Sequence, residues 1–409
     1  MGKQIVLQLT DMAHGGESVG RYEGKTVFVP YGIPGETVRA EIARDRGRFA
    51  QARLLEILSA SPHRVQPPCA HFGTCGGCHW QHLAYGKQLE YKQAIVRAQL
   101  QRIAGLPEAC VRPTLGMVHP WQYRNHVQFS VSRKGELGFM AAASHEVVAI
   151  ERCLLMHPLL VEIFDSLDME LPDLQRLNLR AGIQTGEQMI IFEMSSDEPP
   201  ELDVDWPVSC VLLLSDGTPM TLLGSSYIHE SVAGRTYRLS AASFFQVNTQ
   251  QAERLVTTVS EYLPLGRESV VVDAYCGVGT LTLVLAAKAK QVIGIEANPF
   301  AIADAGANAS DRDNVVFVTG SVAEVMPTLD VSGPLVVLDP PREGLDKAAV
   351  QALLELSPPR IVYVSCDPAT LARDVKDLVA AGYHLGEVQP IDMFPQTYHI
   401  ESVAVLSRS

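Results

Sequence analysis

The sequence predicts an α/β protein whose C-terminal part is a Rossmann-like, doubly wound sheet. From about residue 241 onward, short apolar runs typical of strands alternate with helical stretches. This alternation is typical of a parallel sheet covered by helices on both faces. A polar or thiol residue follows directly after each of four such runs, namely Asp273, Glu296, Asp339 and Cys366. Ligands bind at the carboxyl ends of strands in these sheets, so we expect a site along this edge.

Residues 1–58 predict a small five-stranded, OB-like β-barrel. Short β-rich runs alternate there with Gly and Pro turns such as 32–35. Barrels of this kind commonly bind nucleic acids. Five arginines fall on the later strands and the loop between them: Arg39, Arg44, Arg46, Arg48 and Arg53. They indicate either an RNA-binding face or a solvated surface of a spacer domain.

The sequence predicts a mixed α+β central domain over residues 59–240 and a third domain, which contains the doubly wound sheet, over residues 241–409. A proline-marked linker precedes a predicted helix over 85–103, which Gly105 ends. On that helix we expect the basic residues, Lys92 among them, to leave the apolar residues free to pack. From about 111 to 240, short strands separated by Gly turns predict a mainly antiparallel sheet.

Composition and charge restrict the class of protein. The chain has 409 residues, 47% of them hydrophobic, and no apolar run approaches the roughly 18 residues of a membrane span. Residues 1–160 carry 18 Lys and Arg against 12 Asp and Glu, whereas the remainder carries 15 against 34. A basic part joined to an acidic part is compatible with an RNA face at one end. We expect a cytoplasmic protein without membrane contact.

The turn that follows the predicted strand at 269–273 has the sequence Asp273-Ala-Tyr-Cys-Gly-Val-Gly279 and is suited to S-adenosylmethionine. Its glycines let the backbone approach a ligand closely. Glu296, 23 residues after Asp273, is placed to accept both ribose hydroxyls. The motif differs from that of pyrophosphate binders, and a short turn with nearby acids suits a ligand with a cationic end. Asp339-Pro-Pro-Arg342 predicts a rigid loop that fixes Asp339 over the cleft.

Cys366 and Glu401 together suit methylation of a pyrimidine carbon. Carbon 5 of uridine is a weak nucleophile until a thiolate adds at carbon 6, and a base must later remove the carbon-5 proton. Cys366, in Ser-Cys-Asp-Pro, supplies the thiol, and Glu401, in His-Ile-Glu, supplies the base. Only about 3% of a free thiol is ionised at pH 7, so we expect the helix that follows Pro368 to stabilise the thiolate.

The segment Ser243-Phe-Phe-Gln-Val-Asn248 leads into the helix predicted over 248–262. Gln246 is a candidate contact for the cofactor, and Phe244 is a candidate for stacking on a flipped base. We expect Phe245 in the core and Asn248 as the N-cap of the following helix.

Three of the eight cysteines form the cluster Cys69-x5-Cys75-x2-Cys78, which suits metal binding better than disulfides in a reducing compartment. Cys153 is a candidate fourth ligand, and four thiolates suit a [4Fe–4S] cluster. A zinc site with His71 or His79 as fourth ligand is the alternative, and spacing alone does not separate the two. We expect Cys110, Cys210 and Cys276 to be small buried residues.

Together these motifs resemble the RNA 5-methyluridine (uracil-C5) methyltransferase family, in order and over nearly the whole chain. The sequence 11–21 is similar to the RNA-binding TRAM module of that family. The resemblance implies cofactor contacts at Gln246, Tyr275, Glu296 and Asp339. It also implies a nucleophile at Cys366, a base at Glu401 and a structural [4Fe–4S] cluster on the cysteine pattern.

The expected substrate is a specific uridine in RNA, with 23S ribosomal RNA favoured over transfer RNA. Two alternatives stay open: an RNA cytosine-C5 methyltransferase, which also needs a cysteine nucleophile, and a catalytically inactive RNA-binding protein. Intact Cys366, Glu401 and cofactor turn argue against the second alternative. We expect a monomer.

Overall fold

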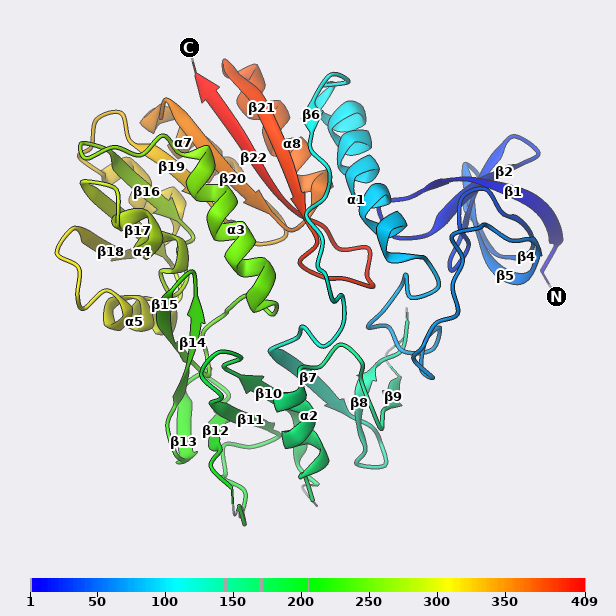
Figure 1. Ribbon diagram of the computed structural model, residues 1–409, viewed down its shortest axis with the longest axis horizontal. Helices are drawn as coiled ribbons and strands as arrows, with labels where there is room; N and C mark the ends of the chain where they lie inside the picture. Colours follow the sequence, from blue (N-terminus) through cyan, green and yellow to red (C-terminus); the bar gives the residue numbers. More distant parts are fainter. Residues whose placement is uncertain (1, 143, 145, 169–171, 205, 409) are drawn as a thin grey trace.

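The computed structural model describes residues 2–142, 144, 146–168, 172–204 and 206–408. An N-terminal barrel lies at one side of the molecule, a seven-stranded sheet lies below, and an eight-stranded sheet carries the C-terminus (Figure 1). Among the helices of these residues, none combines the length and the apolarity needed to cross a membrane. The predicted division at residues 58 and 240 stays a prediction.

The N-terminal strands close into a barrel in the order β1-β2-β3-β5-β4, which confirms the predicted five-stranded module. Apolar side chains alternate inward along β1, where Ile5, Leu7 and Leu9 are buried. This period of two is what a strand with one buried face requires. The strands are β1 (Gln4–Met12), β2 (Ser18–Tyr22), β3 (Lys25–Val29), β4 (Thr37–Asp45) and β5 (Phe49–Ser59).

The central sheet has the order β13-β12-β11-β10-β7-β8-β9, and all of its pairs are antiparallel except β11 with β12. Helix α2 (Pro158–Asp165) packs on it and buries Leu160 and Ile163. The hairpin of β14 (Tyr227–Val232) and β15 (Arg235–Ser240) follows. The sheet strands are β7 (His126–Val131), β8 (Leu137–Met140), β9 (Val147–Ala149), β10 (Leu174–Ala181), β11 (Gln188–Met194), β12 (Ser209–Leu213) and β13 (Pro219–Leu223).

The C-terminal sheet has the order β18-β17-β16-β19-β20-β22-β21-β6. The first five strands are parallel, and β22 runs antiparallel to both β20 and β21. The strands are β6 (Cys110–Val111), β16 (Val270–Ala274), β17 (Gln291–Glu296), β18 (Val315–Thr319), β19 (Leu335–Leu338), β20 (Arg360–Ser365), β21 (Tyr383–Ile391) and β22 (Glu401–Arg408). The predicted Rossmann-like sheet is confirmed, although β21 and β6 were not predicted.

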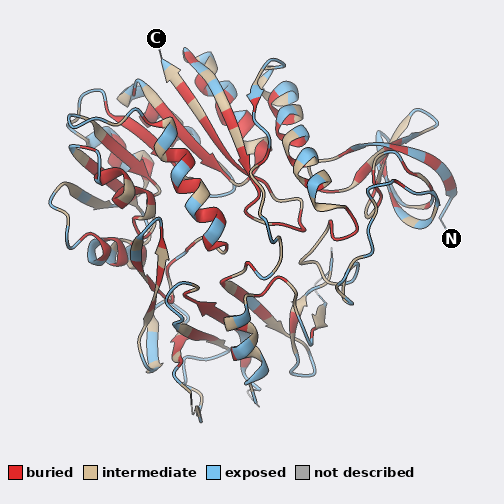
Figure 2. Ribbon diagram, in the orientation of Figure 1, coloured by how far each residue is buried: buried red, intermediate tan, exposed pale blue. Residues whose placement is uncertain are grey.

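Helices cover both faces of this sheet, so its central strands are largely buried and apolar, and β19 is apolar throughout (Figure 2). Val271 and Val337 belong to the core on one face, and their neighbours Val272 and Val336 belong to the core on the other. The helices are α3 (Thr249–Tyr262), α4 (Thr280–Ala286), α5 (Pro299–Asn308), α6 (Val322–Val325), η2 (Met326–Thr328), α7 (Lys347–Leu356) and α8 (Pro368–Ala380).

Helix α1 (Tyr85–Gln99) is far from the C-terminal sheet in the sequence but packs beside it in the fold. It packs against β6, β21 and α8, and it continues as the π-helical turn η1 (Leu100–Ala104). Gly105, with φ of 71°, ends it in the left-handed conformation that glycine adopts without strain. The expectation for Lys92 was wrong, because its side chain is fully buried.

Candidate functional site

The turn between β16 and α4 forms one wall of the candidate site. Its backbone turns through positive φ at Tyr275 (67°), Gly277 (54°) and Gly279 (85°). Asp273, at the end of β16, is fully buried, and its Oδ2 accepts a hydrogen bond of 2.5 Å from Thr282 Oγ1. Its Oδ1 is buried without a hydrogen-bond partner. An unpaired buried carboxylate oxygen is costly, and it marks a place that favours a cationic neighbour.

Glu296, the last residue of β17, holds this turn in place. Its Oε2 accepts from the backbone N of Gly277 at 3.1 Å, and its Oε1 accepts from the backbone N of Asn298 at 2.8 Å. The same carboxylate therefore fixes the cofactor turn and the start of α5. Each carboxylate oxygen can accept a further hydrogen bond, so capacity remains for ligand hydroxyls.

Asp339 follows β19, where its backbone N donates to Ala274 O at 3.2 Å. Burial, with the charge of Asp273 added, raises the pKa of Asp339 to about 7. Burial likewise raises the pKa of Asp273 to about 7. Acids that share a buried corner resist ionisation, because each added negative charge repels the others. A cation bound among them would relieve that repulsion.

Cys366 and Glu401 lie side by side at the end of the sheet. In the antiparallel pair of β20 and β22, Ser365 is the partner of Ser402. Continuing that register by one residue places Cys366 opposite Glu401. The position of Glu401 thus matches the expectation that the final strand lies beside the Cys366 strand. Glu401 is buried, and Cys366 is half-buried.

The surroundings of Cys366 favour the protonated thiol over the thiolate. Burial raises its pKa to about 12, and the carboxyl groups of Glu401 and Asp339 add to the effect. Helix α8 begins just beyond it, as expected, and Arg342 favours the thiolate. Stabilisation of the thiolate by the N-terminus of α8 stays a prediction, and it would have to oppose burial and the two acids. Burial, and then Asp339, also raises the pKa of Glu401 well above its usual range.

Asp367, the neighbour of Cys366, connects several elements. Its Oδ1 caps α8 by accepting from the backbone N of Ala369 at 2.9 Å and of Thr370 at 3.1 Å. Its Oδ2 lies 3.5 Å from His14 Nε2 and 3.7 Å from Arg342 Nε. The sequence did not single out His14 or Arg342 for this role, although both fall within motifs recognised there.

The segment 241–248 approaches the same edge of the sheet. Asn298 Nδ2 donates to Ala242 O at 3.4 Å, which ties the segment to the start of α5. Gln246 contributes its backbone O, which accepts from Asn125 Nδ2 at 2.9 Å. Phe244 is 70% exposed, whereas Phe245 is buried in the core. Phe244 therefore presents a free aromatic face to solvent.

The cysteines Cys69, Cys75, Cys78 and Cys153 line a single cavity of about 570 Å³. Burial raises the pKa of the Cys75 and Cys153 thiols and raises that of Cys78 to about 12. Arg124 also lines the cavity and is the nearby positive charge that opposes these shifts.

Among the described residues, no group of three His, Cys, Asp or Glu side chains is positioned to coordinate a metal ion. His71 and His79 line the same cavity. Of the other cysteines, Cys210 and Cys276 are buried as expected, but Cys110 is exposed because β6 lies at the edge of its sheet.

Comparison with known proteins identifies two sequence families. The model of the tRNA (uracil-5-)-methyltransferase family matches residues 215–332 and 329–409, and the TRAM domain model matches residues 2–55. An uncharacterized RNA methyltransferase of Halalkalibacterium halodurans is 37% identical over 99% of this chain and 98% of its own length. Another, of Thermosynechococcus vestitus, is 36% identical over 100% of this chain and 99% of its own.

A solved structure is similar over the full length. The tRNA (uracil-54, C5)-methyltransferase of Pyrococcus abyssi, in complex with S-adenosyl-L-homocysteine, superimposes with a TM-score of 0.76 at 30% identity. The match covers 98% of this chain and 100% of that one.

Proposed function

This chain belongs to the tRNA (uracil-5-)-methyltransferase family and is an S-adenosylmethionine-dependent RNA methyltransferase with a TRAM domain, and we propose that it methylates carbon 5 of one uridine through a covalent adduct at Cys366. The register that sets Cys366 opposite Glu401 across β20 and β22 carries this proposal. It brings the proposed nucleophile and the proposed base to the same edge of the sheet as Asp339.

The residues around the turn fit S-adenosylmethionine. When bound, this molecule supplies an electrophilic methyl group on a cationic sulfur. Asp339, with its raised pKa, and the unpaired Oδ1 of Asp273 make a corner that favours a cation. We assign Glu296 to the ribose hydroxyls, and Gln246 and Tyr275 to further contacts. The structural relative from Pyrococcus abyssi, which was solved with S-adenosyl-L-homocysteine, supports S-adenosylmethionine as the cofactor.

In the proposed reaction, Cys366 releases its thiol proton to solvent and the thiolate forms a bond to carbon 6 of the uracil ring. The electron pair of the bond between carbons 5 and 6 moves into the ring, which becomes an enolate. Carbon 5 of that enolate forms a bond to the methyl group, and the bond from this methyl group to the donor sulfur breaks, so that a neutral thioether would leave. Glu401, as the carboxylate, then removes the carbon-5 proton, the bond from carbon 6 to sulfur breaks, and the thiolate is restored. A cation bound near Asp339 lowers the pKa of Cys366, because it offsets the negative charge that raises it.

We also propose that Cys69, Cys75, Cys78 and Cys153 hold a [4Fe–4S] cluster. Their common cavity, their partly buried thiols and the neighbouring Arg124 support this proposal, although the four side chains would have to move closer together to hold the cluster. The thiolates would fasten the linker segment of Cys69, Cys75 and Cys78 to Cys153 in the central domain. Zinc is the alternative occupant.

We favour 23S ribosomal RNA as the substrate, with transfer RNA as the alternative. The accessory domains and the cysteine pattern support the first, whereas the name of the Pyrococcus abyssi relative supports the second. A cytoplasmic location and a monomeric state stay predictions from the sequence.

The test is incubation of anaerobically purified protein with labelled S-adenosylmethionine and, separately, unmodified ribosomal and transfer RNA. Nucleoside mass spectrometry then identifies the product. 5-Methyluridine in one pool supports the proposal and selects the substrate. 5-Methylcytidine would replace it with the cytosine reaction, and an absence of label in both pools would leave RNA binding as the activity.

A further inference from the structure

The position of Glu401 depends on the segment 392–400, which we call the base loop. Strand β21 ends at Ile391 and β22 begins at Glu401, and these two residues pair with each other. The base loop therefore leaves the sheet and returns at a single point. Its internal backbone bonds include Met393 N to Ile391 O at 3.0 Å and Thr397 N to Phe394 O at 3.3 Å. These backbone bonds are short-range, so contacts with neighbouring elements must fix the shape of the base loop.

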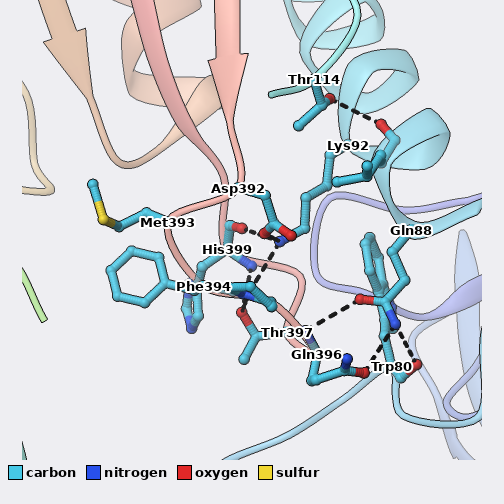
Figure 3. A network of polar contacts seen from close by, with 12 residues as sticks. Trp80, Gln88, Lys92, Thr114, Asp392, Met393, Phe394, Gln396, Thr397 and His399 are labelled. Atoms are coloured by element: carbon cyan, nitrogen blue, oxygen red, sulfur yellow. Dashed lines mark hydrogen bonds and ion pairs between the residues drawn. The ribbon is translucent and has the colours of Figure 1, made fainter. Parts of the chain in front are cut away.

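Lys92 of α1 ties three points of the base loop together (Figure 3). Its Nζ forms an ion pair of 2.5 Å with Asp392 Oδ1, and it donates to Phe394 O at 3.1 Å and to His399 O at 2.8 Å. These are the three donors of an ammonium group, so Lys92 is fully satisfied. Tyr85 OH, from the same helix, donates to Asp392 Oδ2 at 2.7 Å.

Gln88, one turn before Lys92, holds the far end of the base loop (Figure 3). Its Nε2 donates to Gln396 Oε1 at 3.0 Å, and its Oε1 accepts from Gln396 N at 3.1 Å. Gln396 has a φ of 68°, which a non-glycine residue adopts only when its surroundings impose it. The backbone N of Trp80 adds a bond of 3.0 Å to Gln396 O.

Stability alone is a poor reason for a fully buried Lys92–Asp392 pair. Both side chains are wholly inaccessible to solvent. Removing two charges from water opposes much of their attraction, and well-packed apolar residues often stabilise a fold as much or more. A buried pair of this kind instead restricts the chain to one arrangement. Here the restricted element is the segment that ends at Glu401.

On the premise of the proposed function, we propose that Lys92 and Gln88 are positioning residues that hold Glu401 against the carbon-5 proton of the adduct. They act through the base loop and do not touch the substrate. Addition of Cys366 and methyl transfer do not need Glu401, whereas elimination does. A displaced base loop therefore slows the last step selectively, and displacement by about 1 Å is enough to cost about 100-fold in rate.

The test compares a double variant, Lys92→Met with Asp392→Asn, with the control Lys87→Met. The double change avoids an unpaired buried charge, and Lys87 lies on the same helix but pairs with Glu90 at the surface. Gln88→Met is a second variant that disturbs the base loop without altering a charge. Steady-state kinetics, S-adenosylmethionine affinity and the fraction of RNA bound covalently are measured for each.

We expect both test variants to lower kcat by about 10- to 100-fold and to accumulate covalent RNA. Because only a step after adduct formation is slowed, KM for RNA should fall together with kcat, and kcat/KM and cofactor affinity should change less than about twofold. Lys87→Met should behave as wild type. Unchanged kcat, or a lower kcat without accumulated adduct, would overturn the positioning role. Failure of wild-type protein to form 5-methyluridine would instead refute the proposed function itself.

Discussion

His14 Nε2 lies 3.5 Å from Asp367 Oδ2, so the turn between β1 and β2 of the barrel reaches the residue that follows Cys366. A second contact accompanies it, because Trp80 Nε1 donates to Gly16 O at 3.0 Å. The side chain of Tyr398, in the base loop, also lies directly against Gly16. The barrel therefore packs against the segment that contains Cys366 and against the base loop that ends at Glu401. It is more than a tethered RNA-binding module.

His14→Ala should weaken RNA use without affecting the cofactor. Burial lowers the pKa of His14, so its contact with Asp367 joins a mostly neutral imidazole to a carboxylate. Such a partly exposed contact is worth about 1 kcal/mol at most, so we expect KM for RNA to rise by about two- to fivefold. Calorimetry should give an unchanged affinity for S-adenosylmethionine. Lys25→Ala, which breaks a surface pair with Asp45 on the barrel, is the control. A fall in kcat with unchanged KM would show that His14 acts on the chemistry instead.

Cys366→Ala should abolish methylation and leave RNA binding intact. Loss of a covalent nucleophile removes a whole reaction path, so we expect kcat to fall by at least about 10⁴-fold. Filter binding should show RNA affinity within about twofold of wild type, because the side chain is half-buried and small. Cys110→Ala removes an exposed thiol and should keep full activity. Residual turnover above one percent in Cys366→Ala would exclude Cys366 as nucleophile.

Binding of S-adenosylmethionine should weaken below about pH 7, more than that of S-adenosylhomocysteine. Burial and Asp273 raise the pKa of Asp339 to about 7, and a sulfonium bound beside it would lower this pKa. Above pH 7 the carboxylate is already formed, so affinity is flat. Below pH 7 the carboxyl must lose a proton on binding, and affinity falls by up to about tenfold per pH unit. Calorimetry at several pH values checks this, and equal slopes for the two ligands would contradict it.

Cys153→Ser should remove the metal centre. Anaerobically purified wild type is expected to contain about four iron and four sulfide per chain, since a [4Fe–4S] cluster uses four thiolates. The variant should lose most of both and unfold at lower temperature, whereas Cys110→Ser should retain them. Elemental analysis decides the matter. One zinc per chain without iron would replace the cluster with the zinc alternative.

Regular parts of the fold were predictable from local pattern. Apolar runs identify β16, β17, β19 and β20, because parallel strands buried on both faces consist mostly of apolar residues. The polar residues at the ends of those strands form the candidate site, because ligands bind at the carboxyl ends of parallel strands in such sheets. Asn248 was correctly predicted as the N-cap of α3, where its side chain accepts from Gln251 N.

Other features depend on contacts distant in sequence. Strand β21 contains Gly386 and Pro390, which break its local pattern, and pairing with β22 stabilises it nonetheless. Lys92 belongs to a helix with several other basic residues, and only its partner Asp392, 300 residues away, explains its burial. The approach of His14 to Asp367 likewise results from packing of the barrel on the C-terminal domain.

Glu401→Gln gives the most direct test of the proposed mechanism. The variant should add to uridine and accept the methyl group, but elimination should stall because the amide cannot take the carbon-5 proton. The measurement is digestion of the trapped complex followed by peptide mass spectrometry. We predict a uridine nucleotide carrying one added methyl group, attached to Cys366. Normal turnover, or an adduct at another residue or without the methyl group, would contradict the account.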